Sequence, residues 1–205
     1  MTATALVHIV DDDAAVRDSL GFLLETAGLA VRLYASASAL LATLGDDATG
    51  CVITDVRMPG MDGLELQQRL AARGARLKVI VITGHGDVPM AVRALQGGAV
   101  DFLEKTFSDD KLLDAVQRAL TASRASAAAG ARLARLTARE QEVLRALLAG
   151  LGNKEIARDL GVSPRTVEVH RARVMEKMQA DNLPELIHLA LAAGVPSGRD
   201  GAGAV

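Results

Sequence analysis

Short apolar segments alternate with amphipathic segments five times within the first 123 residues. Apolar, β-branched runs predict strands at residues 6–10, 30–34, 51–55, 78–83 and 100–105. Apolar positions spaced three or four apart predict helices at residues 16–27, 36–44, 63–73, 87–96 and 109–123. Strands that alternate with helices build parallel sheets covered on both faces. The first half is therefore expected to be α/β, with a doubly wound five-stranded parallel sheet.

Beyond residue 135 only helical periodicity is present, so the second half is expected to be all-α. Thr137 and Glu140 have the spacing of a capping box at the start of a first helix. Asn153 is expected to cap a second helix, and Ser163-Pro164 to start a third after the Gly161-Val162 turn. Four short helices with a tight turn between the second and third describe a helix-turn-helix.

The two halves meet in an alanine-rich stretch, which favours helix over a flexible coil. We expect it to prolong the preceding helix until Gly130 interrupts it. The resulting division is a first domain at residues 1–123, a linker at 124–135, a second domain at 136–195 and a disordered tail at 196–205.

Charge differs between the halves. Residues 1–124 carry 12 Lys and Arg against 16 Asp and Glu, a net charge of −4. Residues 125–205 carry 11 against 9, a net charge of +2. An acidic module followed by a mildly basic one suits a sensor joined to a nucleic-acid reader.

Other compositional features indicate a cytoplasmic protein. Cys51 is the only cysteine, so no intrachain disulfide forms, and its place in an apolar strand indicates a buried apolar residue. No apolar run reaches the roughly 18 residues that span a bilayer. Met1 to Ala5 lack the pattern of a signal peptide.

Polar residues stand at the ends of four predicted strands. They are Asp11, Asp12, Asp55, Thr83 and Lys105. The carboxyl ends of parallel strands meet at one edge of an open sheet, where such folds bind ligands. Grouped carboxylates need a cation, and oxygen ligands with open positions suit Mg²⁺. Asp55 would then be a nucleophile that forms an acyl phosphate, with the metal, Lys105 and the Thr83 hydroxyl holding the phosphoryl oxygens.

Each of these residues alone also has a purely structural interpretation. Asp11 to Asp13 can serve as a helix N-cap with acidic neighbours, and for Asp13 we prefer that interpretation. Five such residues at strand ends favour a site. Gly84-His85-Gly86 lacks the third glycine of a dinucleotide loop and the lysine of a P-loop, so it is interpreted as a flexible turn.

The third helix of the second half has two unlike faces. Its apolar stripe, which we expect to be buried, consists of Val167, His170, Val174 and Met178. The opposite face, which we expect to enter a DNA major groove, carries Arg165, Glu168, Val169, Ala172 and Arg173. His170 is interpreted as a core histidine, because no second metal-ligand residue stands at a suitable spacing.

Individual contacts to DNA follow from side-chain chemistry. Arg165 and Thr166 at the helix start suit phosphates. Glu168 can accept from cytosine N4 and Val169 can touch a thymine methyl. Lys154 and Arg171 are expected to contact the DNA backbone. The alternative is an ordinary helical packing unit with a solvated charged face.

Residues 6–123 resemble a CheY-like receiver domain. The motifs are Val10-Asp11-Asp12, Asp55 before Arg57-Met58-Pro59, Thr83 and Lys105. The resemblance implies that Asp12, Asp55 and the Arg57 backbone carbonyl bind Mg²⁺, with Asp11 helping through water. It implies that a sensor histidine kinase supplies the phosphoryl group. It also implies that Thr83 moves toward the phosphate and Phe102 turns inward, which reshapes the face of the fourth helix and fifth strand.

Residues 136–193 resemble the LuxR/NarL-type DNA-binding domain. The matching segments are Leu136-Thr137-Ala138-Arg139-Glu140, Asn153-Lys154-Glu155-Ile156-Ala157 and Thr166-Val167-Glu168-Val169-His170. Nearly the whole chain resembles FixJ-type response regulators, notably in Ala99-Val100-Asp101-Phe102 and Ser163-Pro164-Arg165. This resemblance implies a FixL-like kinase partner and phosphorylation-driven homodimerisation through the fourth-helix/fifth-strand face. Double-stranded promoter DNA and RNA polymerase are the further partners implied.

The chain departs from the receiver pattern after the fifth strand. The family usually has Lys-Pro with a cis bond, whereas this chain has Lys105-Thr106. A cis bond without proline costs roughly 2.5–4 kcal/mol. We therefore predict a trans bond here and impaired or altered, but not absent, phosphorylation chemistry.

Two alternatives to a phosphorylation-switched regulator stay open. One is a Mg²⁺-dependent phosphohydrolase that uses Asp55. Such enzymes usually carry a second carboxylate two residues after the nucleophile, where this chain has Arg57. We therefore predict that the chain is not an enzyme. The other is a regulator that works without phosphate because of Thr106.

Overall fold

The structure is a computed structural model, which describes residues 6–45, 48–84 and 88–196. The chain divides into two compact units, Met1–Arg124 and Ala125–Val205. Most of the turn predicted at residues 84–86 and the tail beyond Pro196 lie outside the described residues. No helix within the described ranges is long and apolar enough to cross a bilayer.

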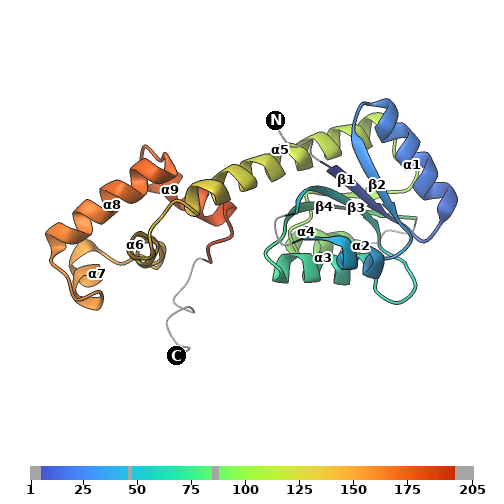
Figure 1. The fold of residues 1–205 in the computed structure, drawn as a ribbon. Helices are drawn as coiled ribbons and strands as arrows, with labels where there is room; N and C mark the ends of the chain where they lie inside the picture. The colour runs from blue at the N-terminus through green and yellow to red at the C-terminus, as the bar shows by residue number, and fades with distance from the viewer. Residues whose placement is uncertain (1–5, 46–47, 85–87, 197–205) are drawn as a thin grey trace. The chain divides into compact units, whose positions relative to one another are not determined.

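Five parallel strands form the sheet of the first unit (Figure 1). They are β1 (Leu6–Val10), β2 (Ala30–Tyr34), β3 (Thr49–Asp55), β4 (Arg76–Thr83) and β5 (Asp101–Glu104). Their order is β2-β1-β3-β4-β5, and every adjacent pair is parallel. The helices are α1 (Ala14–Thr26), α2 (Ala37–Thr43), α3 (Gly63–Ala72), α4 (Val88–Gln96) and α5 (Asp109–Leu133). The predicted doubly wound fold is confirmed.

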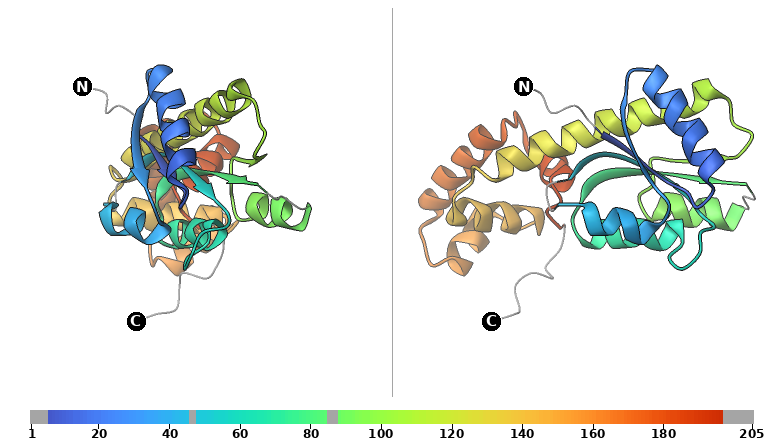
Figure 2. Two further views of the ribbon diagram at one scale, coloured as in Figure 1. Left: turned by 90° about the vertical axis from the view of Figure 1, so that its right-hand side faces the viewer. Right: turned by 45° about the vertical axis from the view of Figure 1, so that its right-hand side comes forward.

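A core fills each face of the sheet, because successive strand residues point to opposite sides. Val52 and Val81 pack in the cluster that includes α2, α3 and α4. Ile53 and Ile82 pack in the cluster that includes α1 and α5. Figures 1 and 2 show this two-sided cover. The loops that follow the strands are thereby held along one edge of the sheet.

Gly63 lets α3 start directly beneath the end of β3. The Gly63 amide donates to the Val56 carbonyl at 3.0 Å. A Cβ at this position would lie 2.2 Å from the backbone oxygen of Asp55, which no side chain can tolerate. The close approach fixes the loop that carries Asp55.

Ser123 ties α5 to the starts of two strands. Its buried hydroxyl accepts from the Gly50 amide at 2.8 Å and donates to the Arg76 carbonyl at 3.0 Å. The sequence does not reveal this role of Ser123, because a serine near a helix end gives no sign of distant partners.

Replacing Ser123 with alanine is expected to lower the unfolding free energy of the first unit by about 1–3 kcal/mol, because two buried backbone groups lose their partner. Urea unfolding followed by Tyr34 fluorescence reports on this unit, since Tyr34 is the only tyrosine and the chain has no tryptophan. Thr121→Ala is the control, because the exposed Thr121 hydroxyl donates to the Gln117 carbonyl of its own helix and has no partner on another element among the described residues. Equal stabilities for the two variants would contradict the prediction.

Helix α5 continues through Gly130 to Leu133. The prediction that Gly130 interrupts this helix is wrong. One glycine costs only about 1 kcal/mol relative to alanine within a helix, and the surrounding alanines favour helix strongly. The stretch expected to be a linker is therefore largely helical.

The second unit contains a helix-turn-helix. Its helices after α5 are α6 (Ala138–Leu148), α7 (Asn153–Asp159), α8 (Pro164–Met178) and α9 (Leu183–Ala192). Gly161, with a φ of +64°, makes the turn between α7 and α8. Val143, Ile156, Val174 and Leu186 are fully buried, one from each helix, in a single core.

The start of α7 differs from the prediction. The N-cap is Gly152, not Asn153. The Gly152 amide donates to a Glu155 carboxylate oxygen at 2.8 Å, while the Asn153 side chain accepts from Arg171 at 3.4 Å. The prediction failed because the Asn153 side chain is engaged by another helix.

The predicted capping box at α6 is present, and it includes an ion pair that the sequence did not reveal. The Thr137 amide donates to Glu140 at 2.8 Å. Lys177 of α8 donates to the same buried carboxylate at 2.6 Å. The hydrogen bond from Lys177 holds the pKa of Glu140 below its usual value. This pair joins α6 to α8.

Candidate functional site

Two buried carboxylates share one ammonium group at the edge of the sheet. Lys105 Nζ lies 2.7 Å from Asp55 Oδ1 and 2.9 Å from Asp11 Oδ2. Asp11 follows β1, Asp55 ends β3, and Lys105 follows β5. Only 1% of Asp11 and 5% of Asp55 is exposed to solvent. The structure thus brings together three predicted site residues from three separate strands.

Backbone groups fix the orientation of both carboxylates. The Arg57 amide donates to Asp55 Oδ2 at 2.7 Å. The Asp13 amide donates to Asp11 Oδ1 at 3.0 Å, while the Asp13 side chain caps α1. The capping role preferred for Asp13 is therefore confirmed.

The charge state of Lys105 follows from this geometry. Partial burial opposes its charge, but the hydrogen bonds to Asp55 and Asp11 outweigh burial and raise the pKa of Lys105. The group is therefore a fixed cation beside Asp55 at neutral pH. The Lys105 amide also donates to the Thr83 carbonyl at 2.6 Å, which places Thr83, itself buried, next to this loop.

The pocket suits a small divalent cation. Two buried carboxylates against one ammonium leave a negative charge, and the donors are oxygens, as Mg²⁺ prefers. Within the described residues, no three Asp, Glu, His or Cys side chains form a ready-made metal cluster. Asp12 and Arg57 stand at the same strand ends with exposed side chains. A metal would therefore have to draw in the Asp12 carboxylate and the Arg57 carbonyl.

The loop after Lys105 has an unusual backbone. No peptide bond between described residues is cis, so the Lys105–Thr106 bond is trans, as predicted. Thr106 has a φ of +139°, a conformation that β-branched residues rarely adopt. Strain is therefore stored beside Lys105, which with Asp11 and Asp55 forms what we call the acid pocket.

Thr83 and Phe102, which are predicted to move on phosphorylation, are buried and half-buried respectively. Thr83 is 1% exposed, and Phe102 is half-buried against the cluster that includes α4. Helix α4 presents an apolar face to solvent, with Val88, Val92 and Leu95 exposed by 77%, 44% and 51%. An exposed apolar face on one helix is the usual mark of a protein contact.

An apolar groove lies beside the acid pocket. It runs between α1 and the loop after β5 and has a volume of about 600 Å³. Phe22 of α1 lines it and is 73% exposed, and Lys105 and Phe107 form part of its other wall. Lys105 therefore borders both this groove and the Asp55 carboxylate.

Helix α8 presents the predicted outward face. Val167, Val174 and Met178 are buried as expected. The five residues predicted to face outward are all exposed: Arg165, Glu168, Val169, Ala172 and Arg173. His170 is half-buried rather than fully in the core, and its buried Nδ1 has no hydrogen-bond partner among the described residues.

The polar groups around α8 are partly paired with one another. Arg165 lies 3.3 Å from Glu168 on the exposed face. Arg171 is half-buried and contacts Asn153, while Lys154 of α7 is exposed and Thr166 is half-buried. A cleft of about 320 Å³ lies where α7 meets α8 and is lined by Asn153, Glu168, Arg171, Ala172 and Met175.

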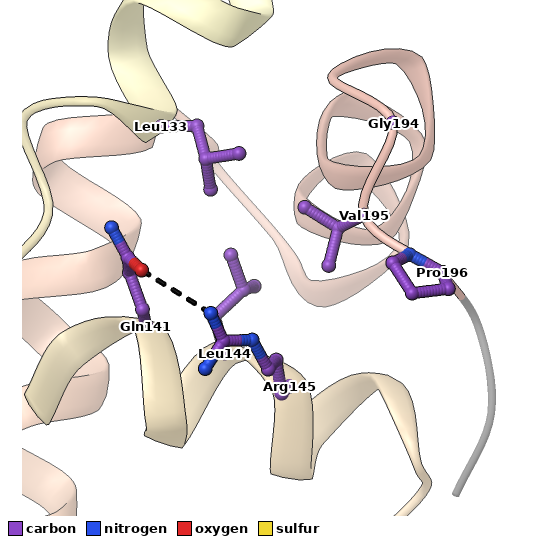
Figure 3. Close-up of a pocket in the computed structure, with 7 residues that line it drawn as sticks. All are labelled: Leu133, Gln141, Leu144, Arg145, Gly194, Val195 and Pro196. Atoms are coloured by element: carbon purple, nitrogen blue, oxygen red, sulfur yellow. Dashed lines mark hydrogen bonds between the residues drawn. The ribbon is translucent and has the colours of Figure 1, made fainter. Parts of the chain in front are cut away.

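A further pocket of the second unit has a volume of about 210 Å³ (Figure 3). Leu133, Leu144, Val195 and Pro196 make its apolar wall, and Arg145 donates to Gln141 at 3.3 Å beside it. None of the residues predicted to contact DNA lines this pocket, so the pocket is separate from the outward face of α8.

Comparison with known proteins accounts for both units. Residues 7–117 match the response regulator receiver domain, and residues 134–190 match the luxR family of bacterial regulatory proteins. The chain is 54% identical to the transcriptional regulatory protein FixJ of Azorhizobium caulinodans over 95% of both chains. Its identity to the FixJ of Bradyrhizobium diazoefficiens is 50% over 95% of this chain and 98% of the other.

Solved structures agree with these matches. The crystal structure of full-length FixJ from B. japonicum has 48% identity and a TM-score of 0.56, and it covers 95% of this chain and 100% of that one. The structure of response regulator StyR is 40% identical to this chain, with a TM-score of 0.56, and it covers 92% of this chain and 99% of that one.

A receiver domain joined to a LuxR-type helix-turn-helix defines a two-component response regulator that controls transcription. Such a regulator works with a kinase and with DNA. Within that class, the chain belongs to the FixJ-type transcriptional regulators.

Proposed function

We propose that Asp55 accepts a phosphoryl group from a sensor histidine kinase of the FixL type. The observation that carries this proposal is the fixed ammonium of Lys105 between two buried carboxylates. A carboxylate oxygen of Asp55 attacks phosphorus, the N–P bond of the phosphohistidine breaks, and the released imidazole takes up a proton. Lys105 and the Thr83 hydroxyl then hold the phosphoryl oxygens.

Asp11, Asp12, Asp55 and the Arg57 carbonyl would hold Mg²⁺ in this pocket. When bound, the metal offsets the charge that the phosphoryl group brings next to the carboxylates. The net negative charge around Lys105 supports this assignment.

The test of the acceptor is to incubate the full-length chain with acetyl phosphate and MgCl₂ and to map the phosphate by mass spectrometry. We expect it on the peptide that contains Asp55. Phosphate on any other residue would contradict the assignment.

Phosphorylation is proposed to act through Thr83 and Phe102 on the face of α4 and β5. The exposed apolar residues of α4 support dimerisation there, because burying Val88, Val92 and Leu95 against a second copy would remove them from water. The dimer would then present two reading helices to double-stranded promoter DNA and act with RNA polymerase. Since its target is the promoter, we place the protein in the cytoplasm.

The proposed DNA contacts follow from the exposed face of α8. Base contacts are assigned to Glu168, Val169, Ala172 and Arg173, and phosphate contacts to Lys154, Arg165, Thr166 and Arg171. No observation favours a phosphohydrolase, and we propose no enzymatic turnover.

Glu168→Ala is expected to relax base preference by about 1–3 kcal/mol of discrimination, because the variant loses an acceptor for cytosine N4. Selection of binding sites from random DNA measures this preference. Glu176→Ala removes the same charge from an exposed position further along α8 and serves as the control. An unchanged site preference for Glu168→Ala would show that the assigned outward face is wrong.

Thr106→Pro is expected to change the rate of phosphorylation by acetyl phosphate roughly tenfold, because it moves the loop beside Lys105, whose ammonium now lies 2.7 Å from Asp55, and small displacements of groups at a reaction site have effects of that size. Proline cannot adopt a φ of +139°, so the loop must rearrange around Lys105. Thr106→Gly accepts the present backbone and should leave the rate unchanged. Equal rates for wild type and Thr106→Pro would mean that this loop does not limit phosphorylation.

A further inference from the structure

Arg17 links α1 to the acid pocket through the backbone. Its Nη1 donates to the main-chain oxygen of Asp11 at 2.7 Å, and the side chain is half-buried. No hydrogen bond of this kind was foreseen from the sequence, in which Arg17 is one polar residue of an amphipathic helix.

The position of Arg17 is unfavourable for the helix itself. It is the fourth residue of α1, which starts at Ala14. Helix N-termini attract anions and disfavour cations, so an arginine here works against the helix dipole. Helix stability therefore does not explain an arginine at this position. The three aspartates that precede α1 do, because they place negative charge beside the arginine. A cation in the first turn after Asp11-Asp12-Asp13 is the sequence signal that could have identified it.

Arg17 completes the immobilisation of Asp11. The Asp11 amide donates to the Tyr34 carbonyl at 3.2 Å. Its two carboxylate oxygens accept from the Asp13 amide and from Lys105. Only the carbonyl is left, and Arg17 binds it. That carbonyl belongs to the planar peptide group that joins Asp11 to Asp12. By binding this carbonyl, Arg17 fixes the orientation of the Asp11–Asp12 peptide group, and with it the direction in which the exposed Asp12 side chain leaves the backbone.

We propose that Arg17 is a positioning residue for the divalent cation, which it serves by orienting the Asp11–Asp12 peptide so that Asp12 meets the metal. This inference rests on the proposed Mg²⁺ site of the phosphoacceptor. Arg17 touches neither the metal nor the phosphoryl group in this scheme and acts only through the backbone of its two neighbours.

Charge and geometry predict opposite results for its removal. Loss of a nearby positive charge alone would strengthen Mg²⁺ binding, because like charges repel. Loss of positioning would weaken it, and groups that orient metal ligands typically change affinity about 10–100-fold. The direction of the change therefore separates the two roles.

The experiment titrates the full-length chain with MgCl₂ and follows backbone amide resonances near Asp55 by NMR. We expect Arg17→Met to bind Mg²⁺ about tenfold more weakly than wild type. Arg17→Lys, which keeps a charged donor with a different reach, should be intermediate. Arg69→Met removes an exposed arginine paired with Glu65 on α3 and should match wild type. Urea unfolding of each variant separates weaker binding from lower stability.

Several results would overturn the inference. Equal or tighter Mg²⁺ binding by Arg17→Met, with wild type binding normally, would remove the positioning role and leave the phosphoacceptor site intact. If Arg17→Met does not fold, the test falls to Arg17→Lys. The positioning role is then overturned if Arg17→Lys binds Mg²⁺ as tightly as wild type does. Wild type that binds no Mg²⁺ would overturn both the inference and the proposed metal site.

Discussion

Replacing Asp55 with asparagine is expected to abolish phosphorylation of the chain by its kinase and by acetyl phosphate. The amide has the size of the carboxylate but is no nucleophile towards phosphorus, so labelling should fall by more than about 100-fold. Lys105 keeps its hydrogen bond to Asp11 at 2.9 Å, so the pocket retains a partner for the ammonium. We expect the unfolding free energy to change by no more than about 1 kcal/mol.

A matched substitution tests whether the effect belongs to this one carboxylate. Asp62 caps α3 by accepting from the Glu65 amide at 2.7 Å, and asparagine caps a helix equally well. Asp62→Asn should therefore be labelled like wild type. Labelling of Asp55→Asn at the wild-type level would mean that another residue is the acceptor.

Mild acid is expected to destabilise the first unit through His8. This histidine lies within β1 and is only 4% exposed. Its Nδ1 is 3.1 Å from the Tyr34 hydroxyl, and the two rings stack with centroids 5.6 Å apart. Burial, helped by the positive charge of Arg32, lowers the pKa of His8 from 6.5 to about 4. The imidazole is therefore neutral in the folded chain.

The sign of the effect follows from proton binding. Between pH 6.5 and about 4 the unfolded chain protonates His8, whereas the folded chain does not. The unfolded state then binds more protons, so stability falls as the pH falls. The contribution is complete above pH 6.5, and its loss approaches about 3 kcal/mol near pH 4.

Urea unfolding at pH 7.5 and pH 5.5, followed by Tyr34 fluorescence, measures this loss before most carboxylates titrate. Wild type should lose roughly 1 kcal/mol over this interval. His8→Gln can still hydrogen-bond with Tyr34 but does not titrate, so its stability should change less. Because the other histidines are common to both proteins, the difference isolates His8. Equal pH dependence in both would contradict a neutral buried imidazole.

The sequence was sufficient to predict the sheet and the edge at which the acid pocket forms. Strand ends in a parallel sheet converge whatever the loop details, so Asp11, Asp55 and Lys105 could be placed together from their positions alone. The buried and exposed faces of α8 were predicted for the same kind of reason, since helical spacing determines which residues share a face.

Contacts between elements distant in sequence were not predictable in this way. The two partners of Ser123 lie 73 and 47 residues away from it in the sequence. Lys177 and Glu140, which pair with each other, are 37 residues apart. His8 stood in an apolar strand, and only the register of β1 with β2 brings Tyr34 beside it. The course of α5 through Gly130 depended on a balance of about 1 kcal/mol, which local pattern does not resolve.

The central claim is that phosphorylation of Asp55 increases the affinity of the second unit for DNA. The most direct measurement is a fluorescence anisotropy titration of a promoter fragment, selected from random DNA by the phosphorylated protein, with and without acetyl phosphate and MgCl₂. Tighter binding by wild type on phosphorylation, with no change for Asp55→Asn, is the predicted result. Equal affinity of wild type with and without the phosphodonor, when mass spectrometry shows Asp55 phosphorylated, would contradict the account.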